Sequence, residues 1–163
     1  MRFQKIGFLL LLLLLLSGCA GVGTVPPAEA DKEELSIAAL FQTEGGDMLH
    51  GSTVCFSTET SSDYGQVDND GTTSISGLPR SGEVQLTILN PRQEVQGAMT
   101  LFFDRGAVID ATTSEDGVGY ITVREDINEV ALLFVLMENS TVQCTLWLAR
   151  TLPPNAELSQ KGT

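Results

Sequence analysis

Apolar and polar residues alternate with a period of two through most of the chain after residue 34. The run EVQLTI shows this most clearly, because Val84, Leu86 and Ile88 fall on one face and polar residues on the other. Successive side chains of a strand point to opposite faces, so the alternation predicts strands with one buried side. Clusters of Gly, Asp, Asn and Ser separate the runs, which is typical of turns between short strands.

We expect eight or nine strands, and their spacing favours one all-β domain, an antiparallel β-sandwich over residues 35–150. The opening strand is Leu35 to Gln42. The run from Val130 to Met137 is apolar on both faces, as in a central strand covered on both sides or a strand that lies under another element. A last strand follows from Thr141 to Ala149, and residues 151–163 are expected to be a flexible tail.

A different pattern fills residues 1–18. Arg2 and Lys5 precede an unbroken apolar run of eleven residues from Ile6 to Leu16. A transmembrane helix needs about 20 such residues, so we expect an export signal rather than a permanent helical anchor. Residues 19–34 are rich in small residues and contain Pro26-Pro27, which predicts a flexible tether.

The end of the apolar run reads Leu16-Ser17-Gly18-Cys19 and resembles the lipobox of bacterial lipoproteins. In that family the cysteine thiol receives a diacylglyceryl group, the signal is removed just before it, and the new amino end can be acylated. The resemblance implies lipidation of Cys19 and a location in the bacterial cell envelope, on the outer leaflet of a membrane and facing away from the cytoplasm. The alternative is an ordinary secretory signal with a chance cysteine.

Charge narrows the range of partners. A chain that starts at Cys19 carries seven basic and 21 acidic residues, a formal charge of −14. Such a surface repels nucleic acid and anionic lipid headgroups. We therefore expect no nucleic-acid partner, and we expect the membrane to be held through the lipid on Cys19.

Cys55 and Cys144 remain as an even pair in an exported protein, which favours a disulfide. Closing a loop of about 90 residues would stabilise the fold by roughly 4–5 kcal/mol in the chain-entropy model. The alternation argues against the bond, because Cys55 falls on the polar face of its run and Cys144 on the apolar face. A disulfide and two free thiols both stay open.

A shift of 46 residues aligns much of the domain with itself. The matched pairs include Gly51 with Gly97, Phe56 with Phe102, and Ile75 with Ile121. Forty-six residues hold three or four strands, which is marginal for a separate core. We expect two similar halves that pack into one sandwich.

Three motifs mark residues 35–90. They are Gly51-Ser52-Thr53-Val54, Asp68-Asn69-Asp70-Gly71 and Gly77-Leu78-Pro79-Arg80-Ser81-Gly82. Together they resemble the transthyretin-like, or prealbumin-like, modules of bacterial surface proteins, which include carboxypeptidase regulatory-like domains. The resemblance implies a prealbumin-like sandwich. The motifs belong to strands and turns, so they support the fold assignment more than any assignment of function.

Candidate chemistry is sparse. The single histidine, His50, lies beside a turn glycine, and no nucleophile motif surrounds any serine, so we expect no enzyme. Asp68 and Asp70 lie in an oxygen-rich loop of a kind that binds calcium. The spacing is not that of an EF-hand, so ordinary turn residues are the alternative, and we expect no other cofactor.

Trp147 alternates away from Leu146 and Leu148 in the last strand. An exposed tryptophan there would be a candidate ligand-binding residue, and burial under a second layer is the alternative.

These observations predict a lipid-anchored, non-catalytic envelope protein that presents its sandwich for adhesion or protein interaction. The alternative is a carbohydrate- or small-ligand-binding lipoprotein that is accessory to a transport or glycan system. In either case the partner is a protein or a glycan that the sequence does not identify.

Overall fold

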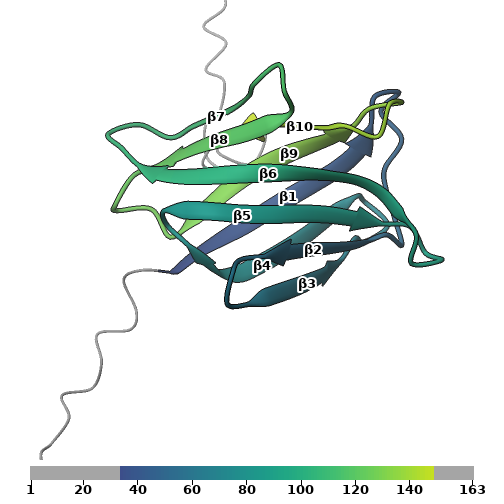
Figure 1. Cartoon of the computed structure of the whole chain (residues 1–163), viewed down its shortest axis with the longest axis horizontal. Coiled ribbons are helices and arrows are strands. Elements are labelled where there is room, and N and C mark those ends of the chain that lie inside the picture. The colour runs from purple at the N-terminus through teal and green to yellow at the C-terminus, as the bar shows by residue number, and fades with distance from the viewer. Residues whose placement is uncertain (1–33, 149–163) are drawn as a thin grey trace, which may run out of the picture. The chain divides into compact units, whose positions relative to one another are not determined.

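The computed structural model describes residues 34–148, which form ten strands in two packed sheets (Figure 1). The strands are β1 (Glu34–Thr43), β2 (Thr53–Ser57), β3 (Ser62–Gln66), β4 (Thr72–Pro79), β5 (Gly82–Leu89), β6 (Val95–Arg105), β7 (Asp110–Thr113), β8 (Val118–Val123), β9 (Glu129–Leu136) and β10 (Val142–Leu146). The predicted all-β sandwich is confirmed, with ten strands rather than eight or nine.

The first sheet has the strand order β10-β9-β1-β4, and the second has the order β3-β2-β5-β6-β8-β7. Most neighbours are antiparallel, but β1 pairs with β9, and β6 with β8, in parallel. The strand count exceeds the expected one partly because β3 and β7 are short and mostly polar. Both lie at the edges of the six-stranded sheet, where a strand needs little apolar alternation.

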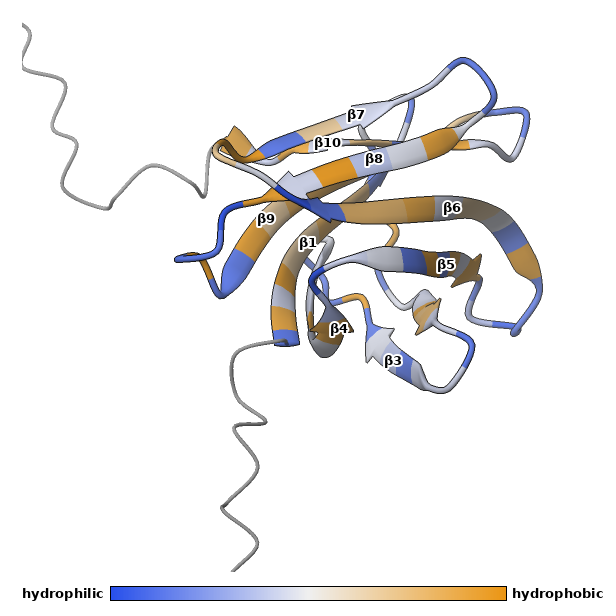
Figure 2. Cartoon of the chain, turned by 60° about the vertical axis from the view of Figure 1, so that its left-hand side comes forward, coloured by the Kyte–Doolittle hydropathy of each residue, from blue (hydrophilic) through white to orange (hydrophobic). Residues whose placement is uncertain are grey.

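The core lies between the two sheets. Figure 2 shows hydrophobic and more polar bands in alternation along β8, as the sequence pattern predicts. Phe134 of β9 stacks on Phe41 of β1 with ring centroids 4.8 Å apart. Phe56, from β2 in the other sheet, meets Phe134 edge-on at 6.1 Å. Aromatic contacts of this geometry bind the two layers together.

The central position predicted for residues 130–137 is confirmed, because β9 lies between β10 and β1. Val130, Leu132 and Phe134 face the core. On the opposite face, Ala131 is buried and Leu133 is half-buried.

The two similar halves expected from the 46-residue shift are not found in the sheet pairing. β2 bonds to β3 and β5, but β6, which follows β2 by that shift, bonds to β5 and β8. The sequence similarity at a shift of 46 residues therefore reflects similar strand lengths and turn spacing. Tertiary packing decides which strands pair, and here it decides differently for the two segments.

The β1 strand begins and the β10 strand ends at the same end of the sandwich, since β9 is parallel to β1 and antiparallel to β10. We call this the terminal end and the opposite one the far end. Arg80, in the β4–β5 turn, closes the terminal end and is only 5% exposed. Its guanidinium donates to the Arg124 carbonyl at 3.3 Å and to Asn128 Oδ1 at 2.6 Å.

Thr113 joins the sheets along the edge formed by β7 and β10. Its hydroxyl accepts from the Cys144 N–H at 2.7 Å and donates to the Cys144 carbonyl at 3.0 Å. This pair of bonds satisfies backbone groups that an edge strand would otherwise leave open.

The predicted export signal, the tether with Cys19, and the tail at residues 151–163 lie outside the described residues. Between residues 34 and 148, no helix has the length and apolar character needed to cross a membrane.

Candidate functional site

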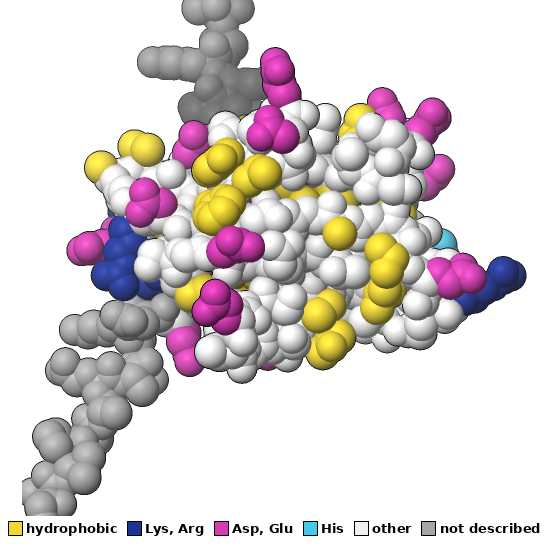
Figure 3. Space-filling model, viewed as in Figure 1, with side chains coloured by type: hydrophobic (Ala, Val, Ile, Leu, Met, Phe, Trp, Pro, Cys, Tyr) yellow, Lys and Arg dark blue, Asp and Glu magenta, His cyan; other side chains and the backbone are white. Residues whose placement is uncertain are grey.

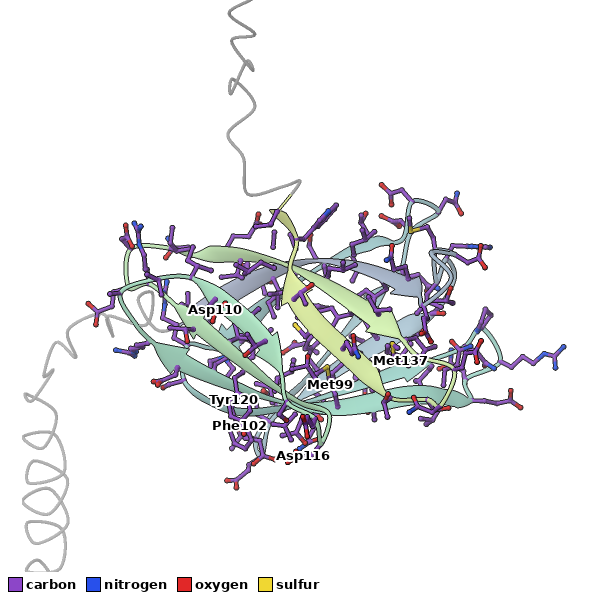
Figure 4. All side chains as sticks on the ribbon, turned by 90° about the horizontal axis from the view of Figure 1, so that it is seen from above. Met99, Phe102, Asp110, Asp116, Tyr120 and Met137 are labelled. Carbon is purple, nitrogen blue, oxygen red and sulfur yellow. The ribbon has the colours of Figure 1, made fainter. Side chains whose placement is uncertain are left out.

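The outer face of the six-stranded sheet carries an exposed pair of aromatic side chains. Phe102 of β6 and Tyr120 of β8 are partners in the parallel ladder. Their rings stack with centroids 5.9 Å apart and planes 20° apart, and they remain 37% and 51% exposed. Figure 4 shows both on the outer side of the sheet, whereas Met99, from the same strand as Phe102, points inward.

Polar side chains continue this face across β5 and β6. Gln85 donates its amide hydrogens to Glu83 Oε1 at 2.7 Å and to Thr100 Oγ1 at 3.0 Å. Glu83 is also the ladder partner of Phe102 on β5. The aromatic pair is therefore bordered by an ordered row of hydrogen-bonding groups.

A groove of about 700 Å³ opens beside this row at the terminal end, between the β2–β3 loop and the β4–β5 turn. Eight of its twelve lining residues carry a hydroxyl or a carboxylate, among them Glu34, Ser57, Glu59, Ser61 and Glu83, and Leu78 and Pro79 add apolar surface. Glu83 and Gln85 belong both to the groove and to the border of the aromatic pair. The two features therefore form one continuous surface.

Negative charge predominates in the described domain. Residues 34–148 contain 17 Asp and Glu against four Arg and no Lys, a formal charge of −13. Figure 3 shows acidic side chains bordering the hydrophobic ones over β6 and β8, with basic side chains at the two ends of the view. A surface of this kind attracts positively charged groups.

The two cysteines are not brought together, so the disulfide weighed from the sequence is not formed. Cys144 is fully buried in the core, and that burial raises the pKa of its thiol to about 12. Cys55 points to the opposite, outer side of its own sheet beside Tyr64, its ladder partner. A hydrogen bond with Cys55 raises the pKa of the Tyr64 hydroxyl. The alternation in the sequence had already placed the two thiols on different faces.

The candidate calcium ligands Asp68 and Asp70 lie in the β3–β4 loop, where they build a turn. Asp70 Oδ1 accepts from the Thr72 hydroxyl at 2.7 Å and from the Thr72 N–H at 3.2 Å. Gly71, between them, has a φ of 80°, which glycine adopts at little cost. Within the described part of the chain, no group of three or more His, Cys, Asp or Glu is placed to hold a metal ion.

Trp147 lies on the other sheet, away from the aromatic pair. Its backbone N–H donates to the Ala131 carbonyl at 2.9 Å, which continues the pairing of β10 with β9. The side chain is half-buried. His50 lies in the loop after β1 at the far end, and its Nδ1 is 3.3 Å from the Met48 carbonyl. Neither residue lines the groove.

Comparison with known proteins finds only distant structural similarity. No protein-family model matches the chain, and no curated protein matches it. Among solved structures, the dioxygenase domain of a dioxygenase–carbohydrate-binding protein fusion from the cellulolytic bacterium Streptomyces sp. SirexAA-E has a TM-score of 0.38 at 14% identity, covering 60% of this chain and 80% of that one. A similarity of this size supports no conclusion about function.

The sequence analysis missed Phe102 and Tyr120 as a site. Each sits at an outward position between two inward ones, Leu101 and Phe103 in one strand and Gly119 and Ile121 in the other. That signal could have marked both as exposed aromatics. Their meeting across 18 residues of chain depends on the parallel pairing of β6 with β8, which the alternation does not predict.

Proposed function

We propose that this chain is a lipid-anchored protein of the bacterial envelope whose β-sandwich is a non-catalytic binding module for adhesion or protein interaction. The observation that carries the binding role is the exposed, stacked pair Phe102 and Tyr120 on the outer face of the six-stranded sheet. Exposed aromatic clusters rimmed by polar groups are typical of interaction sites, since they contribute large contact areas at low entropic cost.

The anchor part of the proposal is supported by the lipobox-like Leu16-Ser17-Gly18-Cys19. A tether that precedes β1 joins the domain at the terminal end. The face that carries Phe102 and Tyr120 is exposed in the described domain. The prealbumin-like character of the sandwich is part of the same proposal and rests on the strand and turn motifs of residues 35–90.

The anchor is tested by the intact mass of the mature protein isolated from membranes. We expect a chain that begins at Cys19 and carries a diacylglyceryl group, with or without a further acyl chain. A mature chain without lipid mass would contradict the anchor and leave a secreted domain.

The binding role is tested with envelope extracts of the producing cells. We expect the full chain to bind the extract, and we expect the double variant Phe102→Ala/Tyr120→Ala to lose that binding. Tyr64→Ala is the matched control, because Tyr64 is 67% exposed on the same sheet but far from the pair. Proteinase treatment of the extract should abolish binding. No binding before treatment, or equal binding by the double variant, would contradict the proposal.

A carbohydrate- or small-ligand-binding role is the second candidate, favoured by the hydroxyl- and carboxylate-lined groove beside the aromatic pair. Small-ligand sites are concave and orient their ligands with a few polar groups, and this groove offers both features. Binding that survives proteinase but is lost after periodate oxidation of glycans would favour this second role over the first.

A further inference from the structure

We infer that the outer face of the six-stranded sheet binds a basic segment, bearing Arg or Lys, of a protein partner. The site is Phe102 and Tyr120 together with Glu83 and Asp104, and we call these four residues the aromatic–acidic patch. The inference names the partner chemistry of the proposed binding module and so rests on that function.

The aromatic half of the patch is suited to a cation. A guanidinium or ammonium group within about 6 Å of a ring centroid is attracted by the negative face of the ring. Phe102 and Tyr120 place two rings 5.9 Å apart, and both keep solvent-exposed surface. A guanidinium can lie on either ring where that ring remains exposed, and its planar, weakly hydrated group favours Arg over Lys at this position.

The acidic half lies next to the rings by strand register. Glu83 is directly opposite Phe102 on β5, and Asp104 is the next outward residue after Phe102 on β6. Directly opposed side chains of neighbouring strands have Cβ atoms about 4.5–5.5 Å apart, so Glu83 lies within reach of a cation on the Phe102 ring. Both acidic side chains are exposed.

Both carboxylates keep capacity for a ligand. Glu83 accepts from Gln85 through Oε1, and Asp104 accepts from the Arg105 N–H through Oδ1. Each bond uses one oxygen, so the second oxygen can accept from a cation. Neither carboxylate forms an ion pair with a basic side chain of residues 34–148.

Net charge decides between a basic segment and a neutral saccharide. The described domain has a formal charge of −13, which adds to the attraction of a cation over the whole face. A neutral sugar gains nothing from that field. A cation gains from the rings, the two carboxylates and the long-range potential together.

The neighbouring groove extends the same chemistry. Its lining includes Glu83 of the patch and also Glu59 and Glu34. A segment that places one basic side chain on the rings can follow the groove and meet further carboxylates. The site therefore favours an extended segment with several basic residues over a single amine.

The test measures binding of a short, labelled arginine-rich peptide to the full chain in detergent at low and high salt. We expect binding that weakens as salt is added, because screening shortens the range of the attraction. Phe102→Ala and Tyr120→Ala should each weaken binding by about twofold to fivefold, the effect of an exposed cation–π contact of roughly 0.5–1 kcal/mol. Tyr120→Leu should weaken it equally, because it keeps apolar area but removes the aromatic face.

Charge-matched variants separate the patch from the general field. Glu83→Gln/Asp104→Asn removes two charges at the patch and keeps the acceptor oxygens that hold the local bonds. Asp68→Asn/Glu138→Gln removes two charges in exposed loops at the far end. We expect the first variant to lose several-fold more affinity than the second, with thermal unfolding of every variant checked in parallel.

Three results would overturn the inference. They are equal losses for the two charge-matched variants, unchanged binding by the aromatic variants, and equal binding of an acidic peptide of the same length. If these occur while the envelope extract still binds through Phe102 and Tyr120, the basic partner is wrong and the binding module stands. If extract binding is also absent, the proposed function itself fails. Competition by a soluble glucan in place of the peptide would transfer the site to a saccharide.

Discussion

Burial sets the chemistry of the two cysteines of the domain. Cys144 faces the core, and the low-polarity surroundings disfavour its thiolate. Cys55, at an outward position, lies beside the exposed Tyr64. The same residue type is therefore an inert part of the core in one strand and a surface group in the other.

The buried thiol makes stability depend on pH in the alkaline range. Its pKa rises from 9.0 to about 12 on folding. As the pH rises, the thiol therefore ionises at a lower pH in the unfolded chain than in the folded one. The stabilising effect of the neutral, buried thiol is complete below about pH 9 and is lost as the pH rises towards 12. Between about pH 8 and pH 10 we expect the free energy of unfolding to fall by about 1 kcal/mol more in the wild type than in Cys144→Ala. Urea unfolding at both pH values measures this difference. An equal change in the free energy of unfolding between the two pH values in both proteins would contradict it.

Arg80 is a buried cation that holds two loops. It donates to the Arg124 carbonyl and to the Asn128 side chain, and its Nε has no partner among the described residues. Such a group is costly to remove, because its acceptors lose their donor and the space it fills is left empty.

We expect Arg80→Ala to lower the free energy of unfolding by about 1–3 kcal/mol, the usual cost of leaving buried polar groups unpaired. Arg92→Ala is the matched control, since Arg92 lies in the exposed β5–β6 turn and should change stability by less than about 0.5 kcal/mol. Equal effects in denaturant unfolding would show that Arg80 does not hold the terminal end.

At the level of elements, the parallel pairing of β6 with β8 creates the candidate site. After β6 the chain forms β7 at the edge of the sheet. It then turns back into β8, which lies between β7 and β6. Alternation in the letters predicts that Phe102 and Tyr120 point outward. It contains nothing about which strands are neighbours, so the pair and its acidic border could not be predicted from it.

Close packing of β6 under the β9–β10 turn depends on Gly97. A Cβ at this position would lie 2.6 Å from Leu136 Cδ1 and 3.1 Å from the Ser140 carbonyl oxygen. Gly97→Ala should therefore cost about 1–3 kcal/mol through overpacking. Gly45→Ala has room and should stay within about 0.5 kcal/mol. Thermal unfolding of both variants measures the contrast, and a neutral Gly97→Ala would mean that the turn moves aside.

At the level of the whole molecule, acidic charge is the dominant surface property. Residues 34–148 contain 17 acidic side chains and only four Arg, and one of these Arg residues, Arg80, is buried. Like charges at this density repel one another and oppose the compact state. The same charge that favours a basic partner thus lowers stability at low salt.

Added salt should therefore stabilise the protein. Between low and moderate ionic strength we expect the midpoint of thermal unfolding to rise by roughly 2–5 °C, which corresponds to about 1 kcal/mol or less for a domain of this size. Scanning calorimetry with NaCl measures the shift. A midpoint that falls with added NaCl would show that attractive pairs outweigh the repulsion.

The sequence by itself determined the local features. Period-two alternation identifies the β class, the inward and outward residue of each strand, the central position of β9 and the opposite faces of the two cysteines. These properties depend on the geometry of a single strand, and residues that are adjacent in the sequence are enough to define it. The acidic character and the lipobox resemblance are likewise properties of the letters alone.

Only the tertiary structure decided what meets across the chain. It decided the two parallel pairings, the polar edge strands β3 and β7, the absence of repeated halves, and the contact of Phe102 with Tyr120. The physical reason is that strand partners are chosen by packing two sheets over one core. That choice balances contacts among all ten strands at once, and no short segment of sequence contains it.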